Sequence, residues 1–297
     1  MCIRDRFGPE QKPCHLRGRF GEGLKLALAK FVGDGLDVYF FTKDIVFKAT
    51  ETPVGKGIAI LLGRSKKYID GTWVLIYGLN EDIARDFLQL LKSMYVKTAG
   101  YEVLDSKVTY GGSDCPKPGY ELVMKPGDAL FVRDIYVNRI SRLASVPSYY
   151  SYNLWWVELE PNRVNVRYGS QLAKGIGQLL ASGPHLLREV LEQSIEVREE
   201  MGSVYAVVHP DFYEIRYARF PEKVPSHVTA WLKPVFEKYG ITAAISSYTS
   251  GLHDLITSVS HFGGIAAVCP SELCSLLIAS RTLYDAIDFI AKRSEEI

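Results

Sequence analysis

Residues 18–25 read GRFGEGLK, and this stretch decides the fold prediction. Its glycines allow backbone angles and a close approach to a ligand that side chains would block. Apolar residues recur at helical spacing from Leu24 to Val32, which predicts a helix that begins near Glu22. The unpaired N–H groups and the positive dipole end of such a helix point back at the glycine segment. The junction is therefore a candidate phosphate site, with Lys25 as an added positive charge.

The plain alternative for this segment is a tight turn before a helix, without any ligand. Two other phosphate-binding loops do not fit it. A Walker A loop needs Gly-Lys-Ser/Thr, and a Rossmann fingerprint needs a hydrophobic strand before its glycines. Residues 12–18 supply neither feature.

A second glycine motif lies downstream, where Gly71-Thr72 opens the hydrophobic stretch Trp73 to Tyr77, a predicted strand. The two motifs resemble the second and third glycine boxes of GHKL ATPases, the superfamily of gyrases, heat-shock chaperones, histidine kinases and mismatch-repair proteins. They lie 50 positions apart (71 minus 21), with predicted strands between them. The resemblance covers residues 18 to about 78 and implies part of a Bergerat-type ATP-binding sandwich.

The resemblance implies ATP and Mg²⁺ as ligands of the intact protein. The second box would form a lid over the phosphates, and the threonine of the third box would hold the adenine through hydrogen bonds and water. The binding residues implied in this way are Gly18, Arg19, Phe20, Gly21, Gly23, Leu24, Lys25 and Thr72. Glu22 is expected to be a lid residue stabilised by the helix dipole, not a general base.

The catalytic residues of the family are expected to be absent from this chain. In the family, the Mg-binding Asn, the general-base Glu and the adenine-binding Asp-x-Gly motif all precede the second box. Only 17 residues precede Gly18 here, and they contain neither an Asn nor an Asp-x-Gly pattern. The parent protein is expected to hydrolyse ATP, whereas the sequence leaves open whether this chain is itself an enzyme.

The first six residues, MCIRDR, resemble a translated adaptor used in sequencing-library preparation. Such a segment would not be native sequence and is excluded from the fold prediction. We therefore expect the chain to be an N-terminally truncated fragment.

A weaker resemblance to the middle domain of several GHKL proteins extends over residues 131–138, 152–154 and 157–163. In some of these proteins an arginine of that domain reaches the γ-phosphate and couples the ATP state to the position of the domain. Arg163, next to Asn162, is the candidate because a guanidinium offers a planar fork to phosphate oxygens. A surface salt bridge at a strand end is the alternative for Arg163.

Hydrophobic periodicity and turn residues predict the secondary structure. Strands are expected at residues 36–42, 44–49, 57–62, 73–77, 129–137, 155–159, 204–208, 213–217, 241–246 and 265–268. Helices are expected at residues 24–32, 81–96, 170–200 with an interruption near Gly183-Pro184, 226–239, 252–261 and 271–293. The order of elements predicts an α+β protein. After the adaptor artefact at residues 1–6, the expected parts are the ATP-binding part at 7–98, a β-rich transducer-like domain at 99–200 and a small α/β domain with a partly parallel sheet at 201–297.

Composition indicates an ordinary folded protein, since 47% of the 297 residues are hydrophobic and 23% are charged. The net charge of +1 does not support binding to nucleic acid or to an anionic membrane. No apolar run reaches the roughly 20 residues that span a bilayer. The five cysteines and six histidines lack the spacing of metal ligands, so no metal site is expected. The cysteines are expected to be free thiols, with Cys269 and Cys274 in the core, which indicates a cytoplasmic location.

Two hypotheses of function stay open. In the first, ATP closes the lid at residues 21–25 and draws the middle domain toward the phosphates. In the second, the chain is a non-catalytic interaction protein whose glycine box is only a turn and whose partner site lies in the C-terminal domain. Dimerisation, which is common in the superfamily, leaves no signature in the sequence.

Two further residue groups are assigned structural roles. Ser246-Ser247 and His253-Asp254 lack the Gly-x-Ser-x-Gly elbow of a hydrolase, so loop and cap roles are expected for them. Stacking on bases is conceivable for the aromatic residues between Tyr149 and Trp156, and packing between domains is the preferred prediction.

Overall fold

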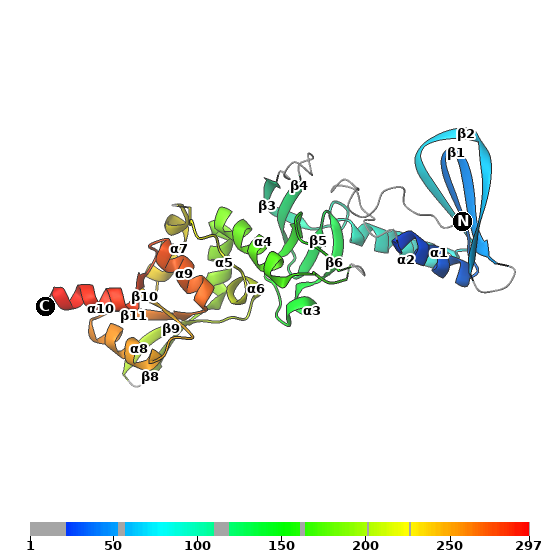
Figure 1. The fold of residues 1–297 in the computed structure, drawn as a ribbon. Helices are drawn as coiled ribbons and strands as arrows, with labels where there is room; N and C mark the ends of the chain where they lie inside the picture. Colours follow the sequence, from blue (N-terminus) through cyan, green and yellow to red (C-terminus); the bar gives the residue numbers. More distant parts are fainter. Residues whose placement is uncertain are drawn as a thin grey trace. The chain divides into compact units, whose positions relative to one another are not determined.

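The computed structural model describes residues 22–52, 57–109, 119–160, 164–200, 202–225 and 227–296. The chain divides into two compact units, and the division falls between Lys92 and Ser93, in the last turn of the second helix. Both units combine helices with sheets, so the fold is α+β, as predicted (Figure 1). Within the described ranges, no helix is long and apolar enough to cross a membrane.

The first unit is a long β-hairpin with a helix packed on one face. Strands β1 (Asp37–Glu51) and β2 (Ile58–Tyr77) pair antiparallel, preceded by helix α1 (Glu22–Gly33) and followed by helix α2 (Glu81–Met94). Leu28 of α1 is buried against Val38, Phe40 and Ala49 of β1. The predicted helices at 24–32 and 81–96 are confirmed, with the second ending two residues early.

The strands of this unit are longer than predicted, and two expected breaks are wrong. The predicted strands at 36–42 and 44–49 are one strand with a bulge at Lys43, whose φ is 53°. The predicted strands at 57–62 and 73–77 are the two ends of β2. Pairing with a long neighbour overrides the weak strand propensity of the residues between them.

The second unit begins with a five-stranded sheet in the order β3-β4-β7-β5-β6. Its strands are β3 (Glu102–Thr109), β4 (Gly119–Lys125), β5 (Ala129–Val132), β6 (Ile135–Arg139) and β7 (Ser151–Leu154), with helix α3 (Ile140–Ala144) between β6 and β7. The predicted strand at 155–159 is wrong, because β7 ends at Leu154 and the chain then bends.

The predicted strand at 129–137 is likewise two strands, β5 and β6, joined by Arg133 and Asp134. Both turn residues have positive φ values, 52° and 68°, as in a tight hairpin turn. Glycine or Asn usually fills such positions, so this turn carries no sequence signal. Buried Asn153 supports it: its Oδ1 accepts a hydrogen bond from the Asp134 N–H at 2.9 Å, and its Nδ2 donates to Asp134 Oδ1 at 2.8 Å.

The remainder of the second unit is an α/β arrangement on another five-stranded sheet, in the order β12-β10-β11-β9-β8. The strands are β8 (Ile195–Glu200), β9 (Ser203–Val208), β10 (Ile241–Ser246), β11 (Ile265–Cys269) and β12 (Tyr284–Asp285). The helices are α4 (Gly169–Ser182), α5 (Pro184–Ser194), α6 (Tyr213–Arg216), α7 (His227–Glu237), α8 (Leu252–His261), α9 (Ser271–Ala279) and α10 (Ala286–Glu295). Strand β8 is antiparallel to β9 and the other pairs are parallel, so the predicted partly parallel sheet is confirmed.

Helices cover both faces of this sheet because its side chains alternate in direction. Ala243 and Ile245 of β10 pack in a cluster with Val259 of α8 and Phe289 of α10. Ala244, which points the other way, belongs to a larger cluster that includes helices α5, α7 and α9. The result is a sheet between two helical layers.

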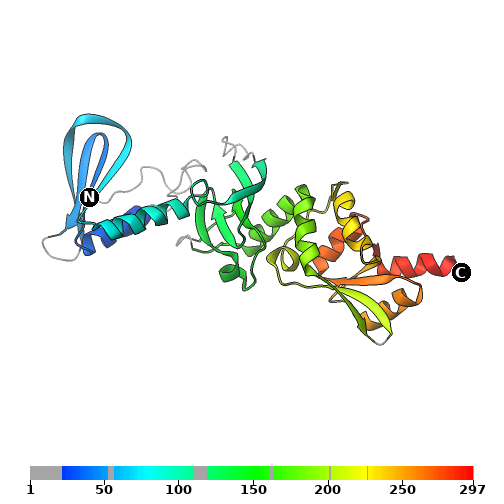
Figure 2. The ribbon, with the colours of Figure 1, turned by 180° about the vertical axis from the view of Figure 1, so that it is seen from behind.

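The larger cluster also joins the two sheets of the second unit. It contains Leu130 and Leu154 of the first sheet, Leu180 of α4, Leu187 of α5 and Ala267 of the second sheet. Figures 1 and 2 show α4 and α5 between the two sheets. The second unit is therefore one body, and the predicted boundary between residues 200 and 201 falls within its β8–β9 hairpin.

Three further predicted elements of the second unit are wrong. The predicted strand at 213–217 is the short helix α6, and the end of the predicted helix at 170–200 is strand β8. The predicted helix at 271–293 is interrupted by β12. Helix α9 ends because Arg281 adopts a positive φ of 57°. Arginine favours helices, so the sequence does not predict this end.

Candidate functional site

The structure describes part of the predicted ATP-binding segment. Gly18, Arg19, Phe20 and Gly21 lie outside the described residues, whereas Gly23, Leu24 and Lys25 lie in the first turn of α1. The predicted helix start near Glu22 is confirmed. The side chains of Leu24 and Lys25 lie outside the description, so contacts between this turn and a ligand stay a prediction.

Thr72 lies within β2, opposite Thr42 of β1, and its side chain is also outside the description. The strand that carries Thr72 and the helix that follows the glycine segment belong to the same unit. They share a small core, in which Leu28 of α1 packs with Val38 of β1 and Ile76 of β2. The binding role of Thr72 stays a prediction.

The candidate phosphate sensor, Arg163, and its neighbour Asn162 lie outside the described residues. Among the residues that are described, no group of three His, Cys, Asp or Glu side chains is arranged to hold a metal ion. The sensor role and the Mg²⁺ requirement of the parent protein therefore stay predictions.

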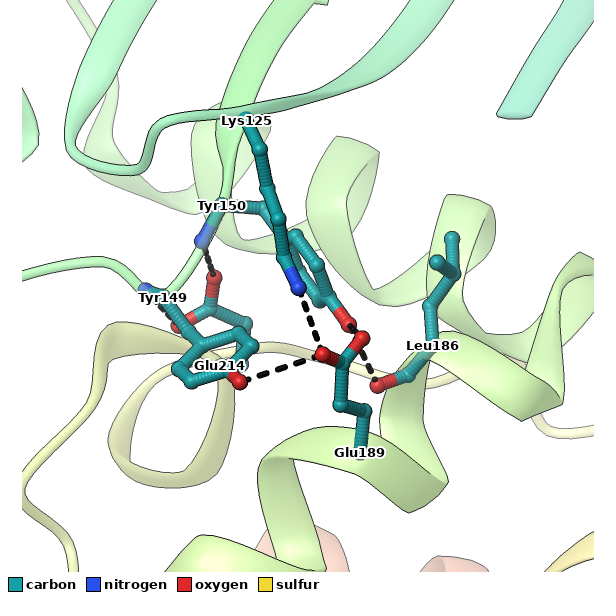
Figure 3. Close-up of polar contacts among 6 residues, drawn as sticks. All are labelled: Lys125, Tyr149, Tyr150, Leu186, Glu189 and Glu214. Atoms are coloured by element: carbon teal, nitrogen blue, oxygen red, sulfur yellow. Dashed lines mark hydrogen bonds and ion pairs between the residues drawn. The ribbon is translucent and has the colours of Figure 1, made fainter. Parts of the chain in front are cut away.

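A polar network that sequence analysis did not single out lies at the junction of the two sheets in the second unit. Its centres are Glu189 of α5 and Glu214 of α6, which contact Lys125 of β4 and the segment Ser148–Tyr152 (Figure 3). We call this set the glutamate clamp. A buried glutamate and an exposed one look the same in a sequence, so no pattern could have revealed it.

Glu214 is fully buried and accepts four hydrogen bonds within the clamp. The hydroxyls of Ser148 and Tyr152 donate to its Oε1 at 2.7 and 2.8 Å. The backbone N–H of Tyr150 donates to Oε1 and that of Tyr149 to Oε2, both at 3.1 Å. Burial raises the pKa of Glu214, while hydrogen bonds from Ser148 and from backbone N–H groups favour its charged form. The carboxyl group is thus held by four donors from one short segment, Ser148–Tyr152.

Glu189 accepts hydrogen bonds from side chains of the same segment, Ser148–Tyr152, and from Lys125. Lys125 Nζ lies 2.5 Å from its Oε1, and the Tyr150 hydroxyl donates to its Oε2 at 2.7 Å and also approaches the Leu186 carbonyl at 3.1 Å (Figure 3). The Tyr149 hydroxyl donates to Oε1 at 3.2 Å. Desolvation alone would raise the pKa of Glu189, but hydrogen bonds from Lys125 and Tyr150 outweigh it and lower the pKa. The same contact raises the pKa of Lys125.

The backbone of the clamp is tightly packed. A Cβ atom on Gly127 would lie 2.3 Å from the Tyr149 carbonyl oxygen, so this position excludes every side chain. Asp128, with a φ of 81°, accepts hydrogen bonds from the Ser141 N–H at 2.8 Å, the Ser141 hydroxyl at 2.6 Å and the Ser148 N–H at 3.3 Å. These contacts fix the start of the segment that the two glutamates hold.

The clamp is arranged to hold structure rather than to perform chemistry. The polar atoms of Glu214 are occupied by donors of the chain, and Lys125 is paired with Glu189 and lies 5.2 Å from the Tyr149 ring centre. Tyr150 connects both glutamates, through its N–H and its hydroxyl. Tyr150 and Tyr152 of the aromatic segment are fully buried in the core that joins the two sheets, so the predicted core packing is confirmed for them, within one unit.

A second place of interest is the carboxyl edge of β10 and β11, whose following helices α8 and α9 pack in different clusters on either side of the sheet. Ligands of open α/β sheets bind at such an edge. The hydroxyl oxygens of Ser246 and Ser271 lie 2.8 Å apart there. Ser246 thus pairs with another serine and not with a base, and it is the last residue of β10 rather than a loop residue as predicted. Cys269 and Cys274 are buried, as predicted.

Comparison of the chain with protein-family models and with curated proteins found no match.

Proposed function

We propose that the chain is part of a GHKL-type ATPase, in which ATP closes a glycine-rich lid and repositions a second body. The observation that carries this proposal concerns the first unit. The helix that follows the glycine segment begins at Glu22 and packs in one small core with the hairpin that contains Thr72. A phosphate at the N-terminus of α1 would meet unpaired N–H groups and the positive end of the helix dipole.

In this proposal the residues of the chain bind and sense the nucleotide but do not cleave it. Backbone groups of residues 18–25 would contact the phosphates, Lys25 would add a charge, and Thr72 would lie at the adenine. Arg163 of the second unit would reach the γ-phosphate in the closed state. Mg²⁺ and the attacking water would need the Asn and Glu that the family carries elsewhere, so ATP turnover is proposed only for the parent protein, in the cytoplasm.

The glutamate clamp gives this proposal a mechanical basis. Tyr150 is bonded to both Glu214 and Glu189, and the core around Leu187 is continuous between the two sheets. A pull on the sheet that precedes Arg163 would therefore move the α/β part with it as one body. ATP closure would act as a switch whose output is the position of the whole second unit.

The proposal is tested first by titration calorimetry of this chain with a non-hydrolysable ATP analogue. At most very weak binding is expected, because the adenine anchor and the metal ligand are missing. Micromolar affinity would contradict the proposed division of the site. In the parent protein, Arg163→Ala should cut ATP turnover sharply and leave the fold unchanged, whereas unchanged turnover would reject the sensor role.

The alternative, a non-catalytic interaction protein, is favoured by one observation in the first unit. Cross-strand pairs place Phe41 with Trp73 and Tyr39 with Leu75 on the face of the hairpin opposite to the one that carries Val38. Trp73 and Leu75 are 62% and 41% exposed. The genomic sequence upstream distinguishes the two functions: an Asn-bearing helix followed by Asp-x-Gly-x-Gly favours the ATPase, and their absence favours the interaction protein.

A further inference from the structure

A cavity of about 590 Å³ lies at the β12 edge of the second sheet, between α7 and α10. Strand β12 is the edge strand of the sheet and has only two residues. The volume is within the range of small-molecule sites, roughly 300–1,000 Å³. The cavity belongs to the second unit alone and is distinct from the predicted nucleotide site.

The floor of the cavity is apolar. Phe236 of α7, Ile241 of β10, Leu283 of the α9–β12 loop and Phe289 of α10 line it, and each is at least nine-tenths buried. The two phenylalanines come from different core clusters, one from each helical layer. The apolar part of the lining therefore comes from both helical layers.

Most charged groups on the rim already have partners. Lys233 pairs with Glu237 at 3.6 Å, and Arg293 pairs with Glu296 at 2.8 Å. Lys292 Nζ lies 3.4 Å from the Tyr284 hydroxyl. Asp285 accepts the N–H of Ile287 at 2.9 Å as the cap of α10. The charges of these rim residues are therefore accounted for by local contacts.

Arg281 is the exception on the basic side of the rim. Its exposed guanidinium has no hydrogen-bond or ion-pair partner among the described residues, although it lines the cavity. Its backbone closes α9 in a Schellman motif, since the N–H groups of Arg281 and Thr282 donate to the carbonyls of Ile278 and Leu277, both at 2.9 Å. Its φ of 57° is a conformation that glycine adopts without strain. An arginine here opposes local preference, which points to a use for its side chain.

We propose that this cavity binds a small organic monoanion, with a carboxylate on the guanidinium of Arg281 and a small apolar body against the apolar part of the lining. A guanidinium binds a carboxylate through two parallel hydrogen bonds. The carboxylates of Asp288, Asp285, Glu237 and Glu296 also line the cavity and oppose a polyanion such as a nucleoside triphosphate. One anionic group per ligand is therefore the chemistry that fits.

The probe for this site is 2-naphthoate, with the neutral 2-naphthalenemethanol as its matched comparison. Backbone amide NMR of the full chain should show 2-naphthoate shifting residues 278–293, with the alcohol binding at least about tenfold more weakly, as expected for loss of a charged hydrogen bond. Shifts confined to other parts of the chain, equal binding of acid and alcohol, or no shift at millimolar 2-naphthoate would each overturn the proposal.

Arg281→Gly separates binding from folding, because glycine is the residue that the Schellman motif prefers. The variant should keep or raise Tm while its affinity for 2-naphthoate falls about tenfold or more. Arg142→Ala, at an exposed arginine in the last turn of α3, is the matched control and should bind as the wild type does. Unchanged affinity in Arg281→Gly would show that the arginine only ends the helix.

Discussion

The hairpin of the first unit and the body of the second unit differ in how completely they bury their own apolar residues. In the first, four of the described residues form the buried core, while Trp73 and Tyr77 are 62% and 58% exposed. In the second, Leu187, Val190 and Leu191 are fully buried in a cluster that joins two sheets.

This difference teaches that the two units depend on their surroundings to different degrees. A two-stranded hairpin is marginally stable by itself in water, and large exposed apolar patches usually mark a surface that something covers. The exposed face of β1 and β2 fits the interaction protein directly, and it fits the proposed ATPase only where another layer of the sandwich covers it. The second unit, with its own sheets, layers and buried polar network, should be stable alone.

The largest effect is expected at the glutamate clamp. Glu214→Ala would leave the hydroxyls of Ser148 and Tyr152 and two backbone N–H groups buried without an acceptor. We expect a loss of about 3–5 kcal/mol in the free energy of unfolding of the second unit, measured by urea denaturation. Glu192→Ala, which breaks a surface pair with Arg188, is the control and should cost less than about 1 kcal/mol. A loss in Glu214→Ala no greater than in the control would mean that the clamp does not hold the unit.

The contrast between the units can be measured directly by hydrogen exchange. Amides of β1 and β2 should exchange about 100-fold faster than those of β10 and β11, which corresponds to about 2.8 kcal/mol in opening free energy. The reason is that β10 and β11 are central strands covered on both faces, whereas the hairpin has open edges and one open face. Equal protection in the two regions would break the comparison.

A smaller effect on stability is expected at Gly177 of α4, where the backbone of the helix lies close to the backbone of Arg219. In Gly177→Ala the new Cβ would lie 2.1 Å from the carbonyl oxygen of Arg219, a clash with backbone that cannot rotate away. We expect a cost of about 1–3 kcal/mol by thermal or urea unfolding. Gly169→Ala in the same helix, where no atom lies within 4 Å of the new Cβ, should change stability by less than about 1 kcal/mol. Similar values for the two variants would argue against tight packing of α4 on the loop at Arg219.

The smallest effect is a pH dependence of the clamp. Because the pKa of Glu189 is lowered in the folded state, its contribution is present above the usual value of 4.5 and is lost as pH falls through the folded pKa. The stability difference between wild type and Glu189→Gln should therefore shrink between pH 6 and pH 3, by about 0.2–1 kcal/mol for a pair this exposed. The pKa of Glu214 is raised by burial, so its contribution has the opposite slope, and Glu214→Gln serves as the contrast. A constant difference across this range would contradict the assignment for Glu189.

Sequence patterns predicted the elements that are strongly periodic and closed by recognisable residues. The helix at 252–261 and the strand at 241–246 have the predicted bounds, and α1 begins where the glycine segment indicated. The turns were predicted poorly where the residues are atypical for them. Arg133, Asp134 and Arg281 all have positive φ without being glycine, so they looked like parts of longer elements.

Of the candidate site, the sequence supplied the glycine segment and the strand of Thr72, but not the clamp. Glu189 and Glu214 lie 25 positions apart (214 minus 189) on two helices and meet only because both pack against the segment around Tyr150. Contacts between residues this distant along the chain leave no local signal. The cavity at Arg281 has the same origin, since its lining comes from five separate elements and their loops.

By itself, the sequence determined the α+β class, the alternation that produces a partly parallel sheet and the placement of a helix after a glycine-rich segment. These follow from local periodicity and from backbone preferences, which act over a few residues. The tertiary structure alone decided which glutamates are buried, which turns form without glycine, and where the apolar floor of the cavity lies. Burial and hydrogen-bond partners depend on which distant segments pack together, and only the folded chain brings those segments into contact.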